Sequence, residues 1–199
     1  MMEFMLSVSG VASLVVVLKV SLDLSSARLW VAQARISPLE TKAYGIMYSP
    51  SLGRVVLPIT YKGEYMGYLS RRIFDDGTPK YVMRSKQPTK MLFRVANEAH
   101  SGVVVLCEDV LSAIRLGKYV TTFAILGTSV SDFALRELTQ GRDHAVIFLD
   151  YDNRIVIKKS RVLRNRLELL IDKVSLVDKP IDPKNLSDKE LSDILISYI

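Results

Sequence analysis

The residue types that form covalent and metal-bound cross-links are almost absent from this sequence. It contains one cysteine, Cys107, and two histidines, His100 and His144, among 199 residues. A single cysteine excludes a disulfide within the chain, and so few thiols and imidazoles exclude a zinc site built from cysteine and histidine ligands. Because Cys107 lies inside an apolar run, we interpret it as a small core residue and not as a nucleophile.

The sequence also lacks a long uninterrupted hydrophobic run. Residues 4–18 are mostly apolar, but serines and a glycine interrupt them, and the stretch is short for a membrane span. Residues 1–3 carry none of the positive charge that precedes the apolar part of a signal peptide. We therefore interpret residues 1–27 as a core-packing segment of unclear role, and we expect no membrane partner.

Positive charge is in moderate excess. The chain has 27 lysines and arginines against 21 aspartates and glutamates, a formal net charge of +6, and 49% hydrophobic residues, enough for a packed core. A basic chain whose acidic residues gather at a few positions is the arrangement expected of a nucleic-acid enzyme with a metal centre.

Two carboxylates follow the apolar run Ala145–Leu149, which is long enough for a buried strand and too short for a helix. Asp150 and Asp152 stand one residue apart, so an extended backbone turns both toward the same face. Two carboxylates on one face at the end of a strand can reach a single cation.

A second apolar run, Val103–Cys107, ends in Glu108-Asp109. Such runs are typical of buried parallel strands, and open α/β sheets bind ligands outside the carboxyl ends of their strands. Carboxylates from two strands would meet there, and carboxylate oxygens are ligands that Mg²⁺ prefers. The sequence therefore predicts a divalent-metal site at this edge.

From residue 103 onward, predicted strands and helices alternate, which indicates a parallel sheet covered by helices on both faces. A smaller mixed unit precedes it, with a capping box at Ser37–Glu40 and a hairpin, while the basic segment 82–94 reads as irregular. The predicted fold class is α/β, or α+β overall. We expect strands at 54–59, 65–70, 103–107, 121–126, 145–149 and 174–177, and helices at 110–116, 129–139, 155–171 and from 187 onward.

The acidic motifs, in this order and spacing, resemble the Toprim domain shared by bacterial and phage primases, topoisomerases and some nucleases. The matching positions are Glu108, Gly127-Thr128, Asp150 with Asp152, and Asp182 in Asp182-Pro183-Lys184. The resemblance implies that Glu108, Asp150 and Asp152 are catalytic and that they bind Mg²⁺ or Mn²⁺ together with Asp182. Mg²⁺ keeps part of its water shell, so a few carboxylates and the substrate phosphates are sufficient ligands.

The resemblance extends upstream to the catalytic core of bacterial-type primases, with phage primases nearest. It is carried by Gly53–Ile59, Gly67–Arg71, Pro79–Tyr81 and Leu92–Arg94. In that family the corresponding basic positions line a groove for template and nucleotide. Here it implies nucleic-acid or nucleotide contacts for Arg71, Lys80, Arg84, Lys86 and Arg94.

The sequence shows three departures from the family pattern. Asp109 and Ser112 stand where most members have glycine and aspartate, which could move an acid that supports the metal ligands to Asp109. Asn153 and the residues after it replace a glycine, and Arg94 replaces a lysine, which retains the charge but changes its geometry.

The expected function is that of a DNA primase core, making short RNA primers on single-stranded DNA from NTPs by Mg²⁺-dependent nucleotidyl transfer, in the cytoplasm, or in the host cytoplasm if a phage encodes it. A metal-dependent Toprim nuclease and an inert Toprim protein that binds nucleic acid or the replisome stay open. The zinc module of such primases is missing, so a partner supplies it in trans, a shorter variant dispenses with it, or the chain is a fragment. A replicative helicase is another partner left open. The expected divisions are 1–27, a primase-core subdomain at 28–100, a Toprim domain at 101–186 and a carboxy-terminal helix at 187–199.

Overall fold

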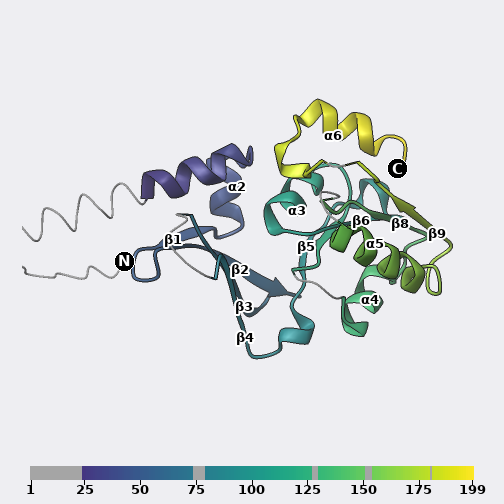
Figure 1. The fold of residues 1–199 in the computed structure, drawn as a ribbon, viewed down its shortest axis with the longest axis horizontal. Coiled ribbons are helices and arrows are strands. Elements are labelled where there is room, and N and C mark those ends of the chain that lie inside the picture. The colour runs from purple at the N-terminus through teal and green to yellow at the C-terminus, as the bar shows by residue number, and fades with distance from the viewer. Residues whose placement is uncertain (1–23, 74–78, 127–129, 151–153, 180) are drawn as a thin grey trace, which may run out of the picture.

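The structure, a computed structural model, describes residues 24–73, 79–126, 130–150, 154–179 and 181–199. Two sheets lie side by side: a four-stranded antiparallel sheet from the first half of the chain and a five-stranded, largely parallel sheet from the second half (Figure 1). The predicted fold class, a parallel sheet flanked by helices and preceded by a smaller mixed α+β unit, is confirmed.

The first sheet is accompanied by the helix at residues 24–33 and by α2 (Pro38–Ala43). The capping box that begins α2 is formed as predicted: the Glu40 amide donates to Ser37 Oγ at 3.2 Å, and the Ser37 amide donates to the Glu40 carboxylate at 2.8 Å. The strands of this sheet follow sequence order and are β1 (Met47–Ser49), β2 (Arg54–Tyr61), β3 (Glu64–Arg72) and β4 (Tyr81–Ser85).

The prediction that residues 82–94 are irregular was wrong. They contribute most of β4, a short 3-10 turn (Pro88–Lys90) and the start of β5 (Phe93–Val95). In β4 no side chain is buried, so the alternation of apolar and polar residues that reveals a half-buried strand is missing. Pairing of its backbone with β3 makes it a strand.

In the second sheet the strand order is β5-β7-β6-β8-β9. The four strands β6 to β9 run parallel, and β5 pairs antiparallel with β7 at one edge. The parallel strands are β6 (Val103–Cys107), β7 (Thr122–Ala124), β8 (His144–Ile147) and β9 (Lys173–Leu176).

Helices cover both faces of the second sheet, as predicted (Figure 1). Alternate residues of β6 show this: Val105 and Cys107 pack in the cluster that includes α3 and α6, and Val104 and Leu106 pack in the one that includes α4 and α5. The helices are α3 (Val110–Leu116), α6 (Asp188–Leu195), α4 (Asp132–Thr139) and α5 (Arg154–Leu167).

The core on the α3 side continues into the first sheet. Leu57 and Ile59 of β2 belong to the same buried cluster as Val110 and Leu111 of α3, and Leu195 of α6 joins it. One shared core therefore links the two sheets, so the acidic edge of the second sheet is held in place against the first. In the described part of the chain no helix is both long enough and apolar enough to cross a membrane.

Candidate active site

Adjacent parallel strands bring two predicted acids to one edge of the sheet. β6 and β8 pair in register from Val103 and His144 to Leu106 and Ile147, so their carboxyl ends lie side by side. Glu108 follows β6, and Asp150 follows the backbone that continues β8. Both residues line one cavity of about 360 Å³, which Asp109, Ser112, Asp182 and Lys184 also line.

Part of the resemblance to the Toprim domain rests on residues that lie outside the described ranges, namely Asp152 and Gly127-Thr128. Within the described ranges, no three carboxylate, imidazole or thiol groups come together in a way that could hold a metal ion. The metal set expected from the sequence therefore stays a prediction, with Glu108, Asp150 and Asp182 as its described members.

Asp109 is the N-cap of α3. Its Oδ1 accepts hydrogen bonds from the amides of Leu111 at 2.9 Å and Ser112 at 3.1 Å, and its Oδ2 accepts one from Ser112 Oγ at 2.8 Å. These bonds satisfy amides that would otherwise lack partners in the first turn of the helix. Ser112, which replaces the family's aspartate, thus supports Asp109 directly.

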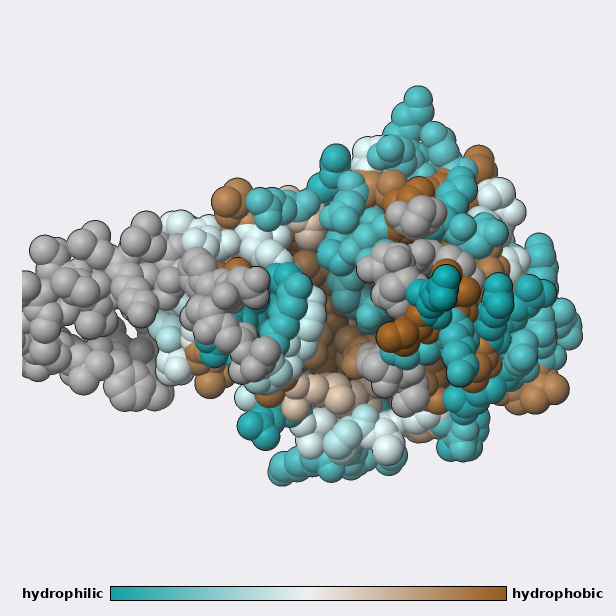
Figure 2. All heavy atoms as spheres, in the orientation of Figure 1, coloured by the Kyte–Doolittle hydropathy of each residue, from teal (hydrophilic) through white to brown (hydrophobic). Residues whose placement is uncertain are grey.

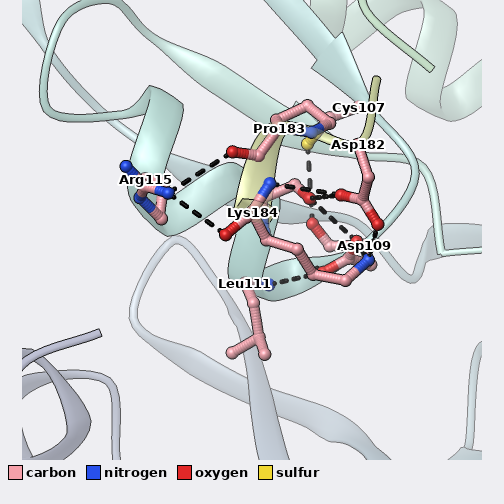
Figure 3. Close-up of polar contacts among 8 residues, drawn as sticks. Cys107, Asp109, Leu111, Arg115, Asp182, Pro183 and Lys184 are labelled. Carbon is pink, nitrogen blue, oxygen red and sulfur yellow. Dashed lines mark hydrogen bonds and ion pairs between the residues drawn. The ribbon is translucent and has the colours of Figure 1, made fainter. Parts of the chain in front are cut away.

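Lys184 joins Asp109 to Asp182 (Figure 3). Its Nζ lies 3.2 Å from Asp109 Oδ2 and also bonds to Asp182 Oδ2. Burial lowers the pKa of the Lys184 ammonium, but the charges of Asp109 and Asp182 and their hydrogen bonds outweigh this effect and raise the pKa well above its usual value. The ammonium is therefore charged at any physiological pH.

Glu108 faces both negative and positive neighbours. Loss of solvent, followed by the negative charges of Asp109 and Asp150, raises the pKa of Glu108, and the charges of Lys159 and Lys184 oppose the shift. Lys159, from α5, lines a second cavity with Glu108, of about 220 Å³. The sequence predicts a helix here but gives no signal that Lys159 lies close to the acids.

Two of the predicted basic residues reach the acidic edge from the first sheet. Arg71 and Lys80 line a cavity of about 270 Å³ together with Asp150, Asp182 and Lys184. Figure 2 shows a hollow between the two sheets on the face that it presents, with hydrophobic surface at its floor and hydrophilic surface around it. The 270 Å³ cavity is thus lined by acids at the edge of the second sheet and by bases from the first half of the chain.

Arg71 is held by aromatic rings. Its guanidinium carbon lies 4.5 Å from the centre of the Trp30 ring and 5.6 Å from that of Tyr81, within the range of cation–π attraction. Trp30 is partly buried against the core and also lines the same cavity as Arg71, and no sequence signal links two residues this far apart in the chain.

The other predicted basic residues lie farther from the acids. Arg84 is exposed on β4, and Lys86 is exposed just after it. Arg94 is exposed on the edge strand β5, where it pairs with Glu98 at 3.7 Å and lies 5.8 Å from the Phe123 ring centre. None of the three lines the cavities around Asp150 described above.

No protein-family model matches the sequence, and no curated protein matches it either. The fold, in contrast, matches solved primase cores. The primase of Aquifex aeolicus, in a structure of its zinc-binding and RNA polymerase domains, superposes with a TM-score of 0.73 and 20% identity, over 86% of this chain and 55% of that one.

Two further structures match in the same way. The catalytic core of Escherichia coli primase gives a TM-score of 0.64 with 18% identity, over 88% of this chain and 72% of that one. The DnaG primase catalytic domain bound to single-stranded DNA gives a TM-score of 0.65 with 18% identity, over 86% of this chain and 72% of that one. The chain thus has the fold of DnaG-type primase catalytic cores and spans about half the length of the Aquifex chain.

Proposed function

We propose that this chain is the catalytic core of a DNA primase, with a Toprim domain formed by the second sheet, and that it synthesises short RNA primers on single-stranded DNA from NTPs. One observation carries the proposal above the others. Glu108 and Asp150 line one cavity at the carboxyl ends of adjacent parallel strands, and Arg71 of β3 and Lys80, directly before β4, line an adjoining cavity with Asp150.

This arrangement suits nucleotidyl transfer because that reaction depends on positioning and charge and needs no nucleophilic side chain. Arg71 and Lys80 present fixed positive charge beside the acids, where the phosphates of an incoming nucleotide would lie. Arg84 and Lys86, exposed on and after β4, would hold the phosphates of the template strand.

The residues at the acidic edge also fit a divalent cation. Burial, together with the charges of Asp109 and Asp150, raises the pKa of Glu108, so a cation held by Glu108 and Asp150 would favour their ionised forms. Glu108, Asp150 and Asp152 would hold Mg²⁺ or Mn²⁺. When bound, the metal supplies charge stabilisation for the attacking and leaving oxygens of an in-line displacement.

The test is one reaction on labelled single-stranded DNA with NTPs and Mg²⁺ or Mn²⁺, read for new RNA and for cleaved template. It compares the wild-type protein with Glu108→Gln, Asp150→Asn and Asp152→Asn. Asp143→Asn is the matched control, because Asp143 is an exposed aspartate directly before β8, at the opposite end of the strand from Asp150. We expect RNA from the wild type and the control and none from the other three variants.

Two outcomes would support the alternatives instead. Metal-dependent cleavage without RNA would make the protein a Toprim nuclease. Retained DNA binding with neither product, even after a zinc-module protein is added in trans, would make it an inert protein that binds nucleic acid or the replisome.

A further inference from the structure

The carboxylates of Asp109 and Asp182, which approach each other from different segments, already share a cation, the ammonium of Lys184 (Figure 3). The Asp109 and Asp182 side chains are 22% and 12% exposed and that of Lys184 is 30% exposed, so the group is shielded from bulk water. All three residues line both cavities that contain Asp150. The ammonium is therefore part of the wall of the candidate active site.

The remaining oxygens of this pair are also engaged by donors of the protein. Asp182 Oδ1 accepts a hydrogen bond from the Lys184 amide at 3.1 Å and one from Ser112 Oγ at 3.4 Å. Asp109 Oδ1 is used in capping α3. A divalent ion between these two carboxylates would have to displace the ammonium and break bonds that shape α3 and the loop after β9.

Glu108 and Asp150 differ from this pair. They follow β6 and β8 and line the 360 Å³ cavity together, and the Lys184 ammonium forms its ion pairs with Asp109 and Asp182 instead. The acidic edge is thus divided into one part whose carboxylates share the ammonium of Lys184 and another part formed by Glu108 and Asp150.

From this division we propose that the ammonium of Lys184 takes the place of one of two divalent cations, so that the site binds a single metal ion on the side of Glu108 and Asp150. The inference rests on the proposed function, since it describes which cations the same site would contain. It also changes the role of Asp182, which the family resemblance makes a metal ligand, to that of a partner of Lys184.

The test measures the number of Mn²⁺ ions bound per chain and their affinity, by equilibrium titration with electron paramagnetic resonance of the free ion. The wild-type protein is compared with Lys184→Met, which keeps the length of the side chain and removes its charge. Lys184→Arg keeps the charge. Lys179→Met is the matched control, because Lys179 is an exposed lysine in the loop that also carries Lys184.

We expect one ion bound to the wild type, Lys184→Arg and Lys179→Met, and a second ion bound to Lys184→Met. The second ion should disappear when Asp182→Asn is added to Lys184→Met. In the wild-type background, Asp182→Asn should leave Mn²⁺ affinity nearly unchanged, whereas Glu108→Gln should weaken it by about tenfold or more, a loss of ~1.4 kcal/mol.

Three results would overturn the inference: a wild-type protein that binds two ions or none, a folded Lys184→Met variant that still binds one, or an Asp182→Asn variant that loses as much affinity as Glu108→Gln. If Lys184→Met does not fold, as judged by circular dichroism, the comparison of Asp182→Asn with Glu108→Gln decides. A protein that binds one ion and makes no RNA would refute the proposed function and leave this inference standing.

Discussion

The guanidinium of Arg115 in α3 is completely buried and meets the carboxylate of Asp188, the first residue of α6, with 2.5 Å between Nη2 and Oδ1. Its Nη1 also donates to the backbone carbonyls of Pro183, Lys184 and Leu186. One side chain thus ties α3, the loop that carries Lys184, and the carboxy-terminal helix together.

Replacing Arg115 should therefore destabilise the protein much more than replacing an exposed arginine. In Arg115→Met, the carbonyls of Pro183, Lys184 and Leu186 lose their donor, and we expect the free energy of unfolding to fall by about 3–5 kcal/mol. Urea denaturation followed by circular dichroism measures this. Arg136→Met, at an exposed arginine of α4, should change it by less than about 0.5 kcal/mol, and equal losses in the two variants would refute the structural role.

The ionised carboxylate of Glu108 should lower the stability of the folded protein. Because its pKa is raised in the folded protein, the charged form is disfavoured there relative to the unfolded chain. In metal-free buffer at pH 7, Glu108→Gln should therefore stabilise the fold, by less than about 1 kcal/mol because solvent screens a partly exposed group.

The stability difference between the wild type and Glu108→Gln should depend on pH in a direction that the raised pKa determines. The penalty is complete above the raised pKa, shrinks as pH falls through it, and vanishes below the ordinary glutamate pKa of about 4.3. Melting curves of the wild type and Glu108→Gln should therefore converge as pH falls toward 4. A wild type that is more stable than Glu108→Gln at pH 7 and loses this advantage on acidification would mean that the pKa is lowered instead.

Gly67 allows β4 to pair closely with β3. Its φ is +146°, and a Cβ added there would overlap the carbonyl oxygen of Arg84 on the paired strand. Gly67→Ala should therefore cost about 1–3 kcal/mol of stability and displace the segment that carries Arg84. Gly63→Ala is the control, since Gly63 also has a positive φ, +83°, but its Cβ would meet no atom within 4 Å. Thermal melting should show the larger loss at Gly67.

The parts of this fold that were predictable from the sequence are those with strong local signals. The buried strands β6 and β8 are continuous apolar runs, the capping box at Ser37 begins α2 as expected, and α6 begins next to residue 187, where a helix was expected to start. A strand buried on both faces is apolar at every position, and its short length distinguishes it from a helix. A capping box depends only on two residues three positions apart, so it can be recognised locally.

What the sequence did not predict depends on contacts between distant segments. The antiparallel strand β5 pairs with β7 at a separation of about thirty residues, and its three residues are too few to show a strand period in the sequence. Lys184 meets Asp109 across 75 residues, and Arg71 of β3 meets Trp30 of the helix at residues 24–33. Charges and rings of this kind have no sequence pattern that marks their partners.

A last test asks whether Arg84 of β4 and Lys86, just after it, hold template DNA. If Arg84 and Lys86 bind phosphates, the variant Arg84→Gln with Lys86→Gln should bind single-stranded DNA less tightly at low salt. Its plot of log affinity against log salt concentration should be shallower by about 0.7 for each phosphate that the variant no longer neutralises, because fewer counterions are released. Fluorescence anisotropy of a labelled oligonucleotide measures both quantities. Lys189→Gln is the control, because Lys189 is exposed on α6, on the other side of the molecule from β4 (Figure 1). An unchanged slope in the double variant would move the template to another surface.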